Sequence, residues 1–254
     1  MSLPPRRAGF PARLPAQEPQ RVERPGTAPR GSPGAPPVPT GSGMDSPAVR
    51  CGMVERLRAL PGMHPQVLEA MSRVPRHLFL DPGLAAQAYL DNALPIGHGQ
   101  TISKPSVVAR AASVVLQALG ERPRKLLEIG TGCGYQAAVL ACVSDEVYSV
   151  ERIRALHELA RRNLRSLRLP NLRLLLADGM AGAPVGAPYD ALISAAAGEQ
   201  APAAWLEQLR PGGVLVAPLG EPQRLTAMRK LNAGRFESWV VEQARFVPLK
   251  SGIL

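Results

Sequence analysis

The residues of this chain with the clearest chemical meaning lie at positions 126–135, which read LLEIGTGCGY. A short apolar run typical of a buried strand carries the acid Glu128 near its end, and three glycines follow at alternate positions. Glycine lets the backbone approach a ligand closely, and the unpaired N–H groups at the start of a helix point toward such a ligand. We therefore predict a loop that binds a nucleotide-bearing cofactor, with a surface turn as the alternative. The residues expected to bind it are Glu128 at the end of the strand and Gly130, Thr131, Gly132 and Gly134 in the loop.

Two further acids follow predicted strands in the same way. Glu151 ends the apolar run at residues 147–150, where folds of this kind place the carboxylate that binds ribose hydroxyls. Asp178 and Gly179 follow the run at residues 172–176, where an acid can accept a hydrogen bond from an adenine amino group. The alternatives are an ordinary exposed Glu151 and a helix cap at Asp178. Together the acids indicate an adenosine-bearing cofactor.

The spacing of the glycines distinguishes two classes of nucleotide-binding enzyme. Hydride-transferring dinucleotide enzymes usually show G-x-G-x-x-G, whereas E-x-G-x-G-x-G resembles the first motif of class I S-adenosylmethionine-dependent methyltransferases. This resemblance implies S-adenosyl-L-methionine as the cofactor and S-adenosyl-L-homocysteine as its product. A nicotinamide-dependent reductase is the less favoured alternative.

A polar segment upstream, LPIGHGQTISKP at residues 94–105, is the second candidate for a site. It is too rich in glycine and polar residues for a core element, so we predict a loop. Polar loops between apolar segments often carry function, although composition alone also fits an ordinary connection. Its chemically useful side chains are His98, Gln100, Thr101 and Ser103.

Four segments together resemble the protein-L-isoaspartate O-methyltransferase family. They are VPRHLF at 74–79, LPIGHGQTIS at 94–103, LLEIGTGCGYQAAVLA at 126–141 and RFVPL at 245–249. Their order and spacing match the family, and the resemblance covers about residues 53–249. It implies transfer of a methyl group from S-adenosyl-L-methionine to the free carboxylate of L-isoaspartyl residues in damaged proteins and peptides. The methyl ester would begin repair through a succinimide.

The same resemblance implies the acceptor side of the site. It marks Ser103 as the active-site residue, and the Ser103 hydroxyl can donate a hydrogen bond that orients the substrate carboxylate. No strong general base is needed, because an isoaspartyl carboxylate with a pKa near ~4 is ionised at neutral pH. The alternative role for Ser103 is a cap on a helix that starts at Pro105. The residues expected to bind substrate are His98, Gln100, Thr101, Ile102, Ser194 and Ala195.

Three positions depart from the family pattern. Cys133 replaces a serine, Lys104 stands where glutamine is common, and Gly198 replaces a frequent proline. The small-for-small change at Cys133 should leave the loop intact and places a thiol near the cofactor. The departures bear on substrate range and loop stiffness. Lys104 and Gly198, together with the long N-terminal tail, leave one alternative open, a chain that binds the cofactor but has lost catalysis and serves as an interaction module.

The rest of the pattern predicts the elements that hold these residues. Helical periodicity predicts two N-terminal helices, and strands then alternate with helices from residue 126 to 219. The order favours one α/β methyltransferase domain over residues 46–254, with a doubly wound, Rossmann-like sheet that is mostly parallel and has an antiparallel edge. The N-terminal helices are predicted at 53–60 and 65–72, later helices at 153–167 and 201–209, and strands at 147–150, 172–176, 189–194 and 214–219. A turn is predicted at 211–213, and a final hairpin pairs 224–231 with 236–246 around Asn232, Ala233 and Gly234.

Residues 1–45 differ in composition from the rest of the chain. They hold eleven of the 27 prolines and little apolar periodicity, so they cannot bury enough apolar surface to offset the entropy lost on ordering. We predict a disordered tail. A secretory signal is disfavoured because no continuous apolar stretch is present, and an organellar leader because prolines interrupt helices. The favoured explanation is an extension from an upstream start, with Met44 or Met53 as the more natural beginning.

A formal net charge of +10 raises the question of nucleic acid as a partner. The basic residues are dispersed and aromatic residues make up only 4% of the chain, so a solvated basic surface is favoured. Residues 194–197 read SAAA where base N-methylating enzymes carry an Asn/Asp-Pro-Pro-aromatic motif, and no cysteine follows a proline as in cytosine C5 enzymes. An RNA methyltransferase is nevertheless the main rival.

Cysteine and histidine usage argues against metal and disulfide chemistry. Cys51, Cys133 and Cys142 include no C-x-x-C pair, and the histidines show no metal-ligand spacing. This pattern fits a reducing cytoplasm. No run of eighteen apolar residues occurs, so we expect no membrane span. We expect a cytoplasmic monomer without a metal, whose partners are isoaspartyl-containing proteins and peptides.

Overall fold

The computed structural model of this chain describes residues 46–232 and 234–254. The tail predicted to be disordered, residues 1–45, and Ala233 of the predicted hairpin turn lie outside the described residues. The described part of the chain begins with helices α1 (Pro47–Arg58) and α2 (Pro65–Arg73). They confirm the two predicted N-terminal helices. None of the helices in the described ranges is long and apolar enough to cross a membrane.

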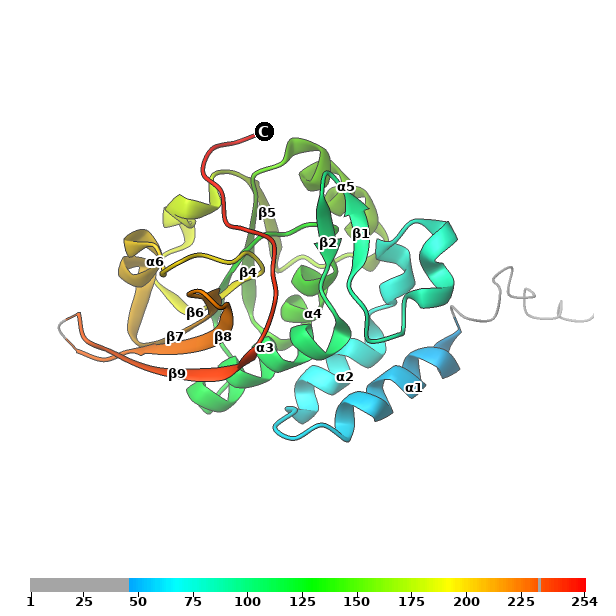
Figure 1. Ribbon diagram of the computed structural model, residues 1–254, viewed down its shortest axis with the longest axis horizontal. Coiled ribbons are helices and arrows are strands. Elements are labelled where there is room, and N and C mark those ends of the chain that lie inside the picture. The colour runs from blue at the N-terminus through cyan, green and yellow to red at the C-terminus, as the bar shows by residue number, and fades with distance from the viewer. Residues whose placement is uncertain (1–45, 233) are drawn as a thin grey trace, which may run out of the picture. The chain divides into compact units, whose positions relative to one another are not determined.

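A seven-stranded sheet forms the centre of the described fold (Figure 1). Its strands lie in the order β5-β4-β3-β6-β7-β8-β9. Neighbours from β5 to β7 are parallel, whereas β8 and β9 run antiparallel to their neighbours. The predicted Rossmann-like sheet, mostly parallel with an antiparallel edge, is confirmed. The strands are β3 (Lys125–Ile129), β4 (Glu146–Glu151), β5 (Leu172–Leu176), β6 (Tyr189–Ser194), β7 (Leu209–Leu219), β8 (Arg224–Lys230) and β9 (Phe236–Gln243).

Helices pack on both faces of the sheet. Successive residues of a strand point to opposite faces, and accordingly Leu126 and Leu127 of β3 belong to different hydrophobic clusters. One cluster includes residues of all helices from α1 to α5, and the other includes Trp205 of α6. The later helices are α3 (Pro105–Leu119), α4 (Tyr135–Val143), α5 (Arg154–Leu164) and α6 (Ala203–Gln208). The short 3-10 helices are η1 (Arg76–Phe79), η2 (Pro82–Gln87), η3 (Arg165–Leu167), η4 (Gly179–Ala181) and η5 (Pro184–Gly186).

The strand order reverses at β3. The chain runs outward from β3 to β4 and β5, and then returns to β6 on the other side of β3. In open parallel sheets, ligands bind beyond the carboxyl ends of the strands at such a reversal. The glycine loop follows β3, Glu151 ends β4, Asp178 follows β5 and Ala195 follows β6. The fold therefore brings these predicted site residues to one edge of the sheet.

The polar segment predicted to be a loop is instead a β-hairpin, so that prediction was wrong. β1 (Leu94–Gly97) pairs antiparallel with β2 (Gln100–Ile102) in a two-stranded sheet separate from the large one (Figure 1). The paired residues Leu94 and Ile102 are buried. The turn at His98 has a positive φ of 52° and lies between two glycines. The glycines that suggested a loop therefore form the turn of a short hairpin.

The turn predicted at residues 211–213 lies inside strand β7, so this prediction was also wrong. The pairing of β6 with β7 shifts register between Tyr189 and Ala191, and the strand continues past Pro211 through this irregularity. A Cβ at Gly213 would lie 3.1 Å from the carbonyl oxygens of Tyr189 and Asp190. The glycine therefore allows a close approach between two strands, which local composition does not distinguish from a turn.

Candidate active site

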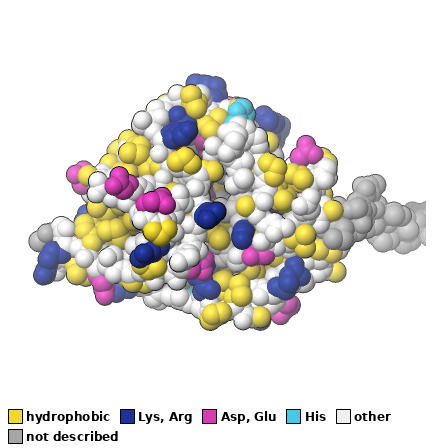
Figure 2. Space-filling model, in the orientation of Figure 1, with side chains coloured by type: hydrophobic (Ala, Val, Ile, Leu, Met, Phe, Trp, Pro, Cys, Tyr) yellow, Lys and Arg dark blue, Asp and Glu magenta, His cyan; other side chains and the backbone are white. Residues whose placement is uncertain are grey.

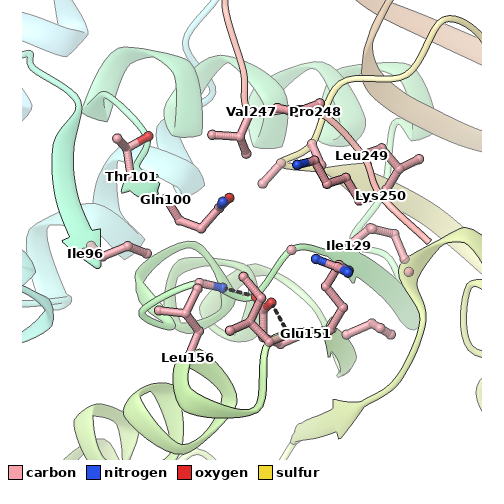
Figure 3. A pocket seen from close by; sticks show the side chains of 18 residues that line it. Ile96, Gln100, Thr101, Ile129, Glu151, Leu156, Val247, Pro248, Leu249 and Lys250 are labelled. Carbon is pink, nitrogen blue, oxygen red and sulfur yellow. Dashed lines mark hydrogen bonds between the residues drawn. The ribbon is translucent and has the colours of Figure 1, made fainter. Parts of the chain in front are cut away.

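Three adjoining cavities bring most of the predicted site residues together at the carboxyl edge of the sheet. The glycine-loop cleft runs along Gly130 and Glu151 (Figure 3). The junction cavity lies between Gly130 and Ser103. The Ser103 hollow lies between Ser103 and the segment after β9. Thr101 and Ala195 line all three, so they stand where the cavities meet.

The glycine loop turns directly from β3 into α4. Gly130 and Gly134 have φ of 91° and 95°, a conformation that residues with a side chain rarely adopt. A Cβ at Gly134 would also lie 2.9 Å from Cδ1 of Leu164, so both conformation and space require glycine there. Gly130 and Gly132 line the glycine-loop cleft, and Thr131 lines the junction cavity. Gly134 lies behind them as the N-cap of α4.

Glu151 lines the cleft and also fixes the loop, while its predicted contact with a ribose stays a prediction. Its carboxylate accepts hydrogen bonds from the backbone N–H of Gly132 at 2.8 Å and of Ile153 at 2.9 Å (Figure 3). Each carboxylate oxygen has two lone pairs, so acceptor capacity is left for a ligand hydroxyl. The acid therefore joins the ends of β3 and β4 beside the position expected for a ribose.

Glu128 is fully buried and lines none of the three cavities. The Ser149 hydroxyl donates a hydrogen bond to its carboxyl group, and the Thr131 hydroxyl lies 2.6 Å from that of Ser149. Burial raises the pKa of Glu128 to about 8, against the opposing hydrogen bond from Ser149. Glu128 is therefore mostly neutral at pH 7. It contacts the loop indirectly, through the hydroxyl groups of Ser149 and Thr131. Its direct contact with a cofactor stays a prediction.

Asp178 has the helix-capping role that was the alternative for it. Its carboxylate accepts from the backbone N–H of Met180 at 2.8 Å, at the start of η4. It also accepts from the backbone N–H of Gly252 at 2.7 Å, near the end of the chain. The neighbouring Gly179 is buried and lines the glycine-loop cleft. Asp178 thus lies at the cleft margin, and its role toward an adenine stays a prediction.

The segment after β9 lines the cleft, although its residues were not predicted as site residues. The backbone of Ala197 donates to Val247 O at 2.8 Å and accepts from Leu249 N at 2.7 Å. These bonds hold residues 247–250 against the cleft (Figure 3). Arg152, which also lines the cleft, donates from Nε to Gly252 O at 2.8 Å and so binds the continuation of this segment. The RFVPL resemblance was the only signal in the sequence for this segment, and it carried no site role.

The hairpin residues divide among the cavities. Gln100 and Thr101 line the glycine-loop cleft, and Ile102 is buried and lines the junction cavity. His98 is exposed at the hairpin tip and lines none of the three cavities. Gln100 and Thr101, predicted to bind substrate, are therefore next to the cofactor position as well, whereas His98 is not brought to the site.

Ser103 follows β2 and lines both the junction cavity and the Ser103 hollow. Lys104, and not Ser103, is the N-cap of α3, and α3 has no side-chain cap bond. The structure therefore does not support the helix-cap alternative. Among the side-chain hydrogen bonds of the described residues, Ser103 takes part only through its carbonyl oxygen, which accepts from Arg76 at 2.8 Å. Its half-buried hydroxyl can therefore serve a ligand.

Of the two predicted substrate-binding residues where β6 ends, Ala195 lines the cavities and Ser194 does not. Ser194 is 2% exposed, and its hydroxyl donates to Ala196 O at 2.7 Å. It shapes the turn that presents Ala195 to all three cavities. A Cβ at Gly130 would lie 3.4 Å from Cβ of Ala195, so the glycine loop and this turn are in close contact.

Two family departures have clear structural settings. Cys133 is buried, and burial raises the pKa of its thiol to about 11. The thiol is therefore protonated and unreactive at neutral pH. Gly198 donates its backbone N–H to Pro218 O at 3.1 Å, a bond that a proline in its place would lack. Neither departure disrupts the described site.

Comparison with known proteins identifies the family. The family model for protein-L-isoaspartate(D-aspartate) O-methyltransferase (PCMT) matches residues 51–253. Protein-L-isoaspartate O-methyltransferases from Burkholderia mallei (strain SAVP1) and Burkholderia thailandensis (strain E264) are each 56% identical over 214 residues. The match covers 83% of this chain and 66% and 65% of those relatives. The chain thus spans just under two thirds of the length of these curated relatives.

Two solved structures share the fold. A Plasmodium falciparum chain described as a protein-L-isoaspartate O-methyltransferase, in complex with S-adenosyl-L-homocysteine, superposes with a TM-score of 0.69 at 21% identity. The match covers 79% of this chain and 98% of that one. A second protein-L-isoaspartate O-methyltransferase matches with a TM-score of 0.68 at 26% identity, over 80% of this chain and 67% of that one. On the family and sequence matches, this chain belongs to the protein-L-isoaspartate(D-aspartate) O-methyltransferase family.

Proposed function

We propose that this chain transfers a methyl group from S-adenosyl-L-methionine to the free carboxylate of L-isoaspartyl residues in damaged proteins and peptides. The observation that carries the proposal is the junction cavity, which Ser103 and Gly130 line together. The residue expected to orient the acceptor thus lies next to the loop expected to hold the methyl donor. The Burkholderia relatives that carry the corresponding name are 56% identical over the matched region.

The residues of the glycine-loop cleft fit S-adenosyl-L-methionine. A Cβ at Gly132 would lie 3.1 Å from a side-chain carbon of the β1–β2 hairpin, so only glycine leaves this cradle open. Glu151 is suited to ribose hydroxyls, and Asp178 with Gly179 to an adenine. When bound, the cofactor would supply a methyl group on a positively charged sulfur. The Plasmodium falciparum neighbour holds S-adenosyl-L-homocysteine, the product of such a transfer.

The acceptor side needs orientation and little acid–base chemistry. An isoaspartyl carboxylate has a pKa near ~4 and is ionised at neutral pH, so no group of the chain must remove a proton. The Ser103 hydroxyl can donate a hydrogen bond to one carboxylate oxygen and leave the other directed at the methyl carbon. That oxygen forms the new C–O bond as the C–S bond breaks. Fixing two reacting atoms in this way accounts for much of enzymatic rate acceleration.

The product would be a methyl ester, whose alkoxide leaves more readily than a carboxylate oxygen. Attack by the neighbouring backbone nitrogen expels methanol and closes a succinimide. Hydrolysis of the succinimide returns part of the material to normal aspartate. The chemistry after methyl transfer needs no further residue of this chain, which is consistent with a site that provides only binding and orientation.

The rival activity, methylation of RNA, has less support. On the face shown in Figure 2, basic and acidic side chains are interspersed and no continuous basic surface is seen. A chain that binds the cofactor but has lost catalysis is the other alternative. Cys133 and Gly198 leave the described site intact, whereas Lys104 lines the Ser103 hollow and is the departure that bears on it.

Methyl incorporation distinguishes these activities. The full chain is incubated with S-adenosyl-L-methionine labelled in the methyl group, together with an isoaspartyl peptide or with RNA. We expect label on the peptide as a base-labile ester and none on the RNA. Label on RNA with none on the peptide would overturn the proposal, and label on neither would favour the inactive alternative.

The setting of the enzyme is part of the proposal. We place it in a reducing cytoplasm, since the described cysteines, Cys51, Cys133 and Cys142, are all free thiols. We also propose that it acts as a monomer, because Ser103 and the glycine loop already meet within one chain and the proposed chemistry needs no residue from a second one. Light scattering of the purified chain would test the monomer, and a dimer mass would contradict it.

A further inference from the structure

Arg76, in the VPRHLF segment, is fully buried but lines none of the three cavities of the site. Burying a guanidinium is costly unless hydrogen bonds and neighbouring groups compensate for the lost hydration. The proposed methyl transfer makes no direct use of this residue. Its contacts, however, connect the two sides of the site.

The hydrogen bonds of Arg76 fasten both ends of the β1–β2 hairpin. Its Nη2 donates to the carbonyl oxygen of Asn92, before β1, at 3.3 Å, and to that of Ser103, after β2, at 2.8 Å. Its Nε donates to the carbonyl oxygen of Ala88 at 2.8 Å. One planar group thus bonds three backbone segments that are separate in sequence. The position of the Ser103 backbone is set by this group.

The same guanidinium contacts the glycine loop. Its central carbon lies 4.7 Å from the ring centroid of Tyr135, the first residue of α4 after Gly134. A cation over an aromatic face is attracted to it. Phe79, from the same segment as Arg76, packs edge-on against this ring at a centroid distance of 5.5 Å. Arg76 therefore spans from Ser103 on the acceptor side to Tyr135 on the cofactor side.

Resting on the methyl transfer proposed above, we propose that Arg76 is a positioning residue that acts through Ser103. It holds the Ser103 backbone at a fixed distance from the glycine loop, so that the acceptor oxygen and the methyl carbon meet in line. A displacement of about 1 Å at a reacting centre can reduce the rate by about a hundredfold. Loss of this link should therefore lower kcat and leave cofactor binding intact.

A double-mutant cycle tests this role. Arg76→Lys keeps a charge but loses the planar fork and most of the stacking. We expect Arg76→Lys to lower kcat for an isoaspartyl peptide by about tenfold, with an unchanged Kd for S-adenosyl-L-homocysteine. In a chain that already carries Ser103→Ala, we expect Arg76→Lys to lower kcat by less than a further factor of about two. The effects of residues that act through one another are not additive. The proposal would be overturned if the loss of kcat in the double variant equalled the product of the two single losses, or if Arg76→Lys alone caused no loss of kcat.

Arg56→Gln is the matched control for a purely structural effect. Arg56 donates from Nη2 to Tyr89 O at 2.8 Å, next to the Ala88 carbonyl that Arg76 uses, but it has no bond to Ser103. We expect Arg56→Gln to lower the thermal midpoint and to keep kcat within about twofold of the parent. An equal kcat loss in this control would show that Arg76 acts only through stability.

If Arg76→Lys does not fold, the same cycle is run with Tyr135→Leu, which removes the ring beside the guanidinium and leaves the three bonds of Arg76 to backbone carbonyls in place. We expect a kcat loss of about threefold that again fails to multiply with Ser103→Ala. Full multiplication would contradict the proposal here too. A parent chain that methylates no isoaspartyl peptide would instead refute the proposed function, so the two failures are distinguishable.

Discussion

The cofactor side and the acceptor side of this site are built from different kinds of structure. The cofactor side consists of loops that follow neighbouring parallel strands, and the bond from Gly132 to Glu151 joins two of these loops directly. The acceptor side adds a two-stranded hairpin outside the large sheet and the segment after β9, which line the Ser103 hollow and also reach the glycine-loop cleft. Long-range bonds from Arg76 and Ala197 hold these pieces in place. The difference implies that cofactor binding and methyl transfer can be impaired separately.

The largest separate effect is expected at Ser103. Ser103→Ala should lower kcat by about tenfold to a hundredfold, the range for loss of a hydrogen bond to a charged group. Cofactor affinity, measured by titration calorimetry with S-adenosyl-L-homocysteine, should stay unchanged. Ser106→Ala is the control. Ser106 lies in the first turn of α3, its backbone N–H and its hydroxyl bond the carboxylate of Asp91, and it lines none of the three cavities. Full activity in Ser103→Ala would rule out the positioning role.

The converse effect is expected at Gly134. Gly134→Ala should weaken cofactor binding by about tenfold and lower stability by about 2 kcal/mol, because its φ of 95° and its contact with Leu164 leave no place for a methyl group. Gly120→Ala is the control for backbone strain alone, since Gly120 has a φ of 71° and no heavy atom within 4 Å of an added Cβ. Equal cofactor affinities for parent and Gly134→Ala would remove the glycine loop from the cofactor site.

A smaller change in cofactor binding is expected at Asp178. Asp178→Ala should weaken binding by about threefold to tenfold, since the predicted hydrogen bond to an adenine and the observed anchor for Gly252 would both be lost. Asp81→Ala makes the same type of change at a remote site, where Asp81 accepts from Gly83 N at 2.8 Å. If both variants bind S-adenosyl-L-homocysteine as the parent does, Asp178 serves only as a cap.

An effect of a different kind, on the pH dependence of stability, is expected at Glu128, which is buried behind the glycine loop. A pKa raised to about 8 means that the folded chain favours the neutral carboxyl group. Its stabilising effect is fully present below about pH 4.5 and is lost as pH rises through about 8. Over that window, the parent should lose stability relative to Glu128→Gln as pH rises, by roughly 1 kcal/mol per pH unit at most. Thermal midpoints that change in parallel for both proteins would contradict a buried neutral acid.

The cofactor side was largely predictable from sequence, and the reason is local. Strands β5 and β6 have the predicted bounds, because each is an apolar run between turn residues. The glycine spacing and the acids Glu151 and Asp178 follow such strands, so parallel strand ends bring them together without further information. The support given by buried Glu128 was not visible, since the strand pattern does not show which side of the loop an acid faces.

The acceptor side was less predictable because its contacts are not local. The β1–β2 hairpin reads as a loop, since its glycines and polar residues outnumber the buried Leu94 and Ile102. The contact of Ala197 with Val247 and Leu249 joins segments about fifty residues apart, and no periodicity records such a contact. The bonds of Arg76 likewise depend on the folded positions of three separate carbonyl groups. Only the family resemblance indicated these segments.

Methyl transfer to an isoaspartyl peptide and to its aspartyl twin, identical except for the backbone linkage, tests the proposed function most directly. Both peptides are offered to the full chain with labelled S-adenosyl-L-methionine under the same conditions. We predict label on the isoaspartyl peptide and background incorporation on the twin, because the free carboxylate is attached to Cα in the isoaspartyl residue but is one CH2 further from the backbone in aspartate. A site that fixes one carboxylate oxygen next to Ser103 should therefore accept only the first. Equal labelling of the two peptides, or labelling of neither, would contradict a repair methyltransferase.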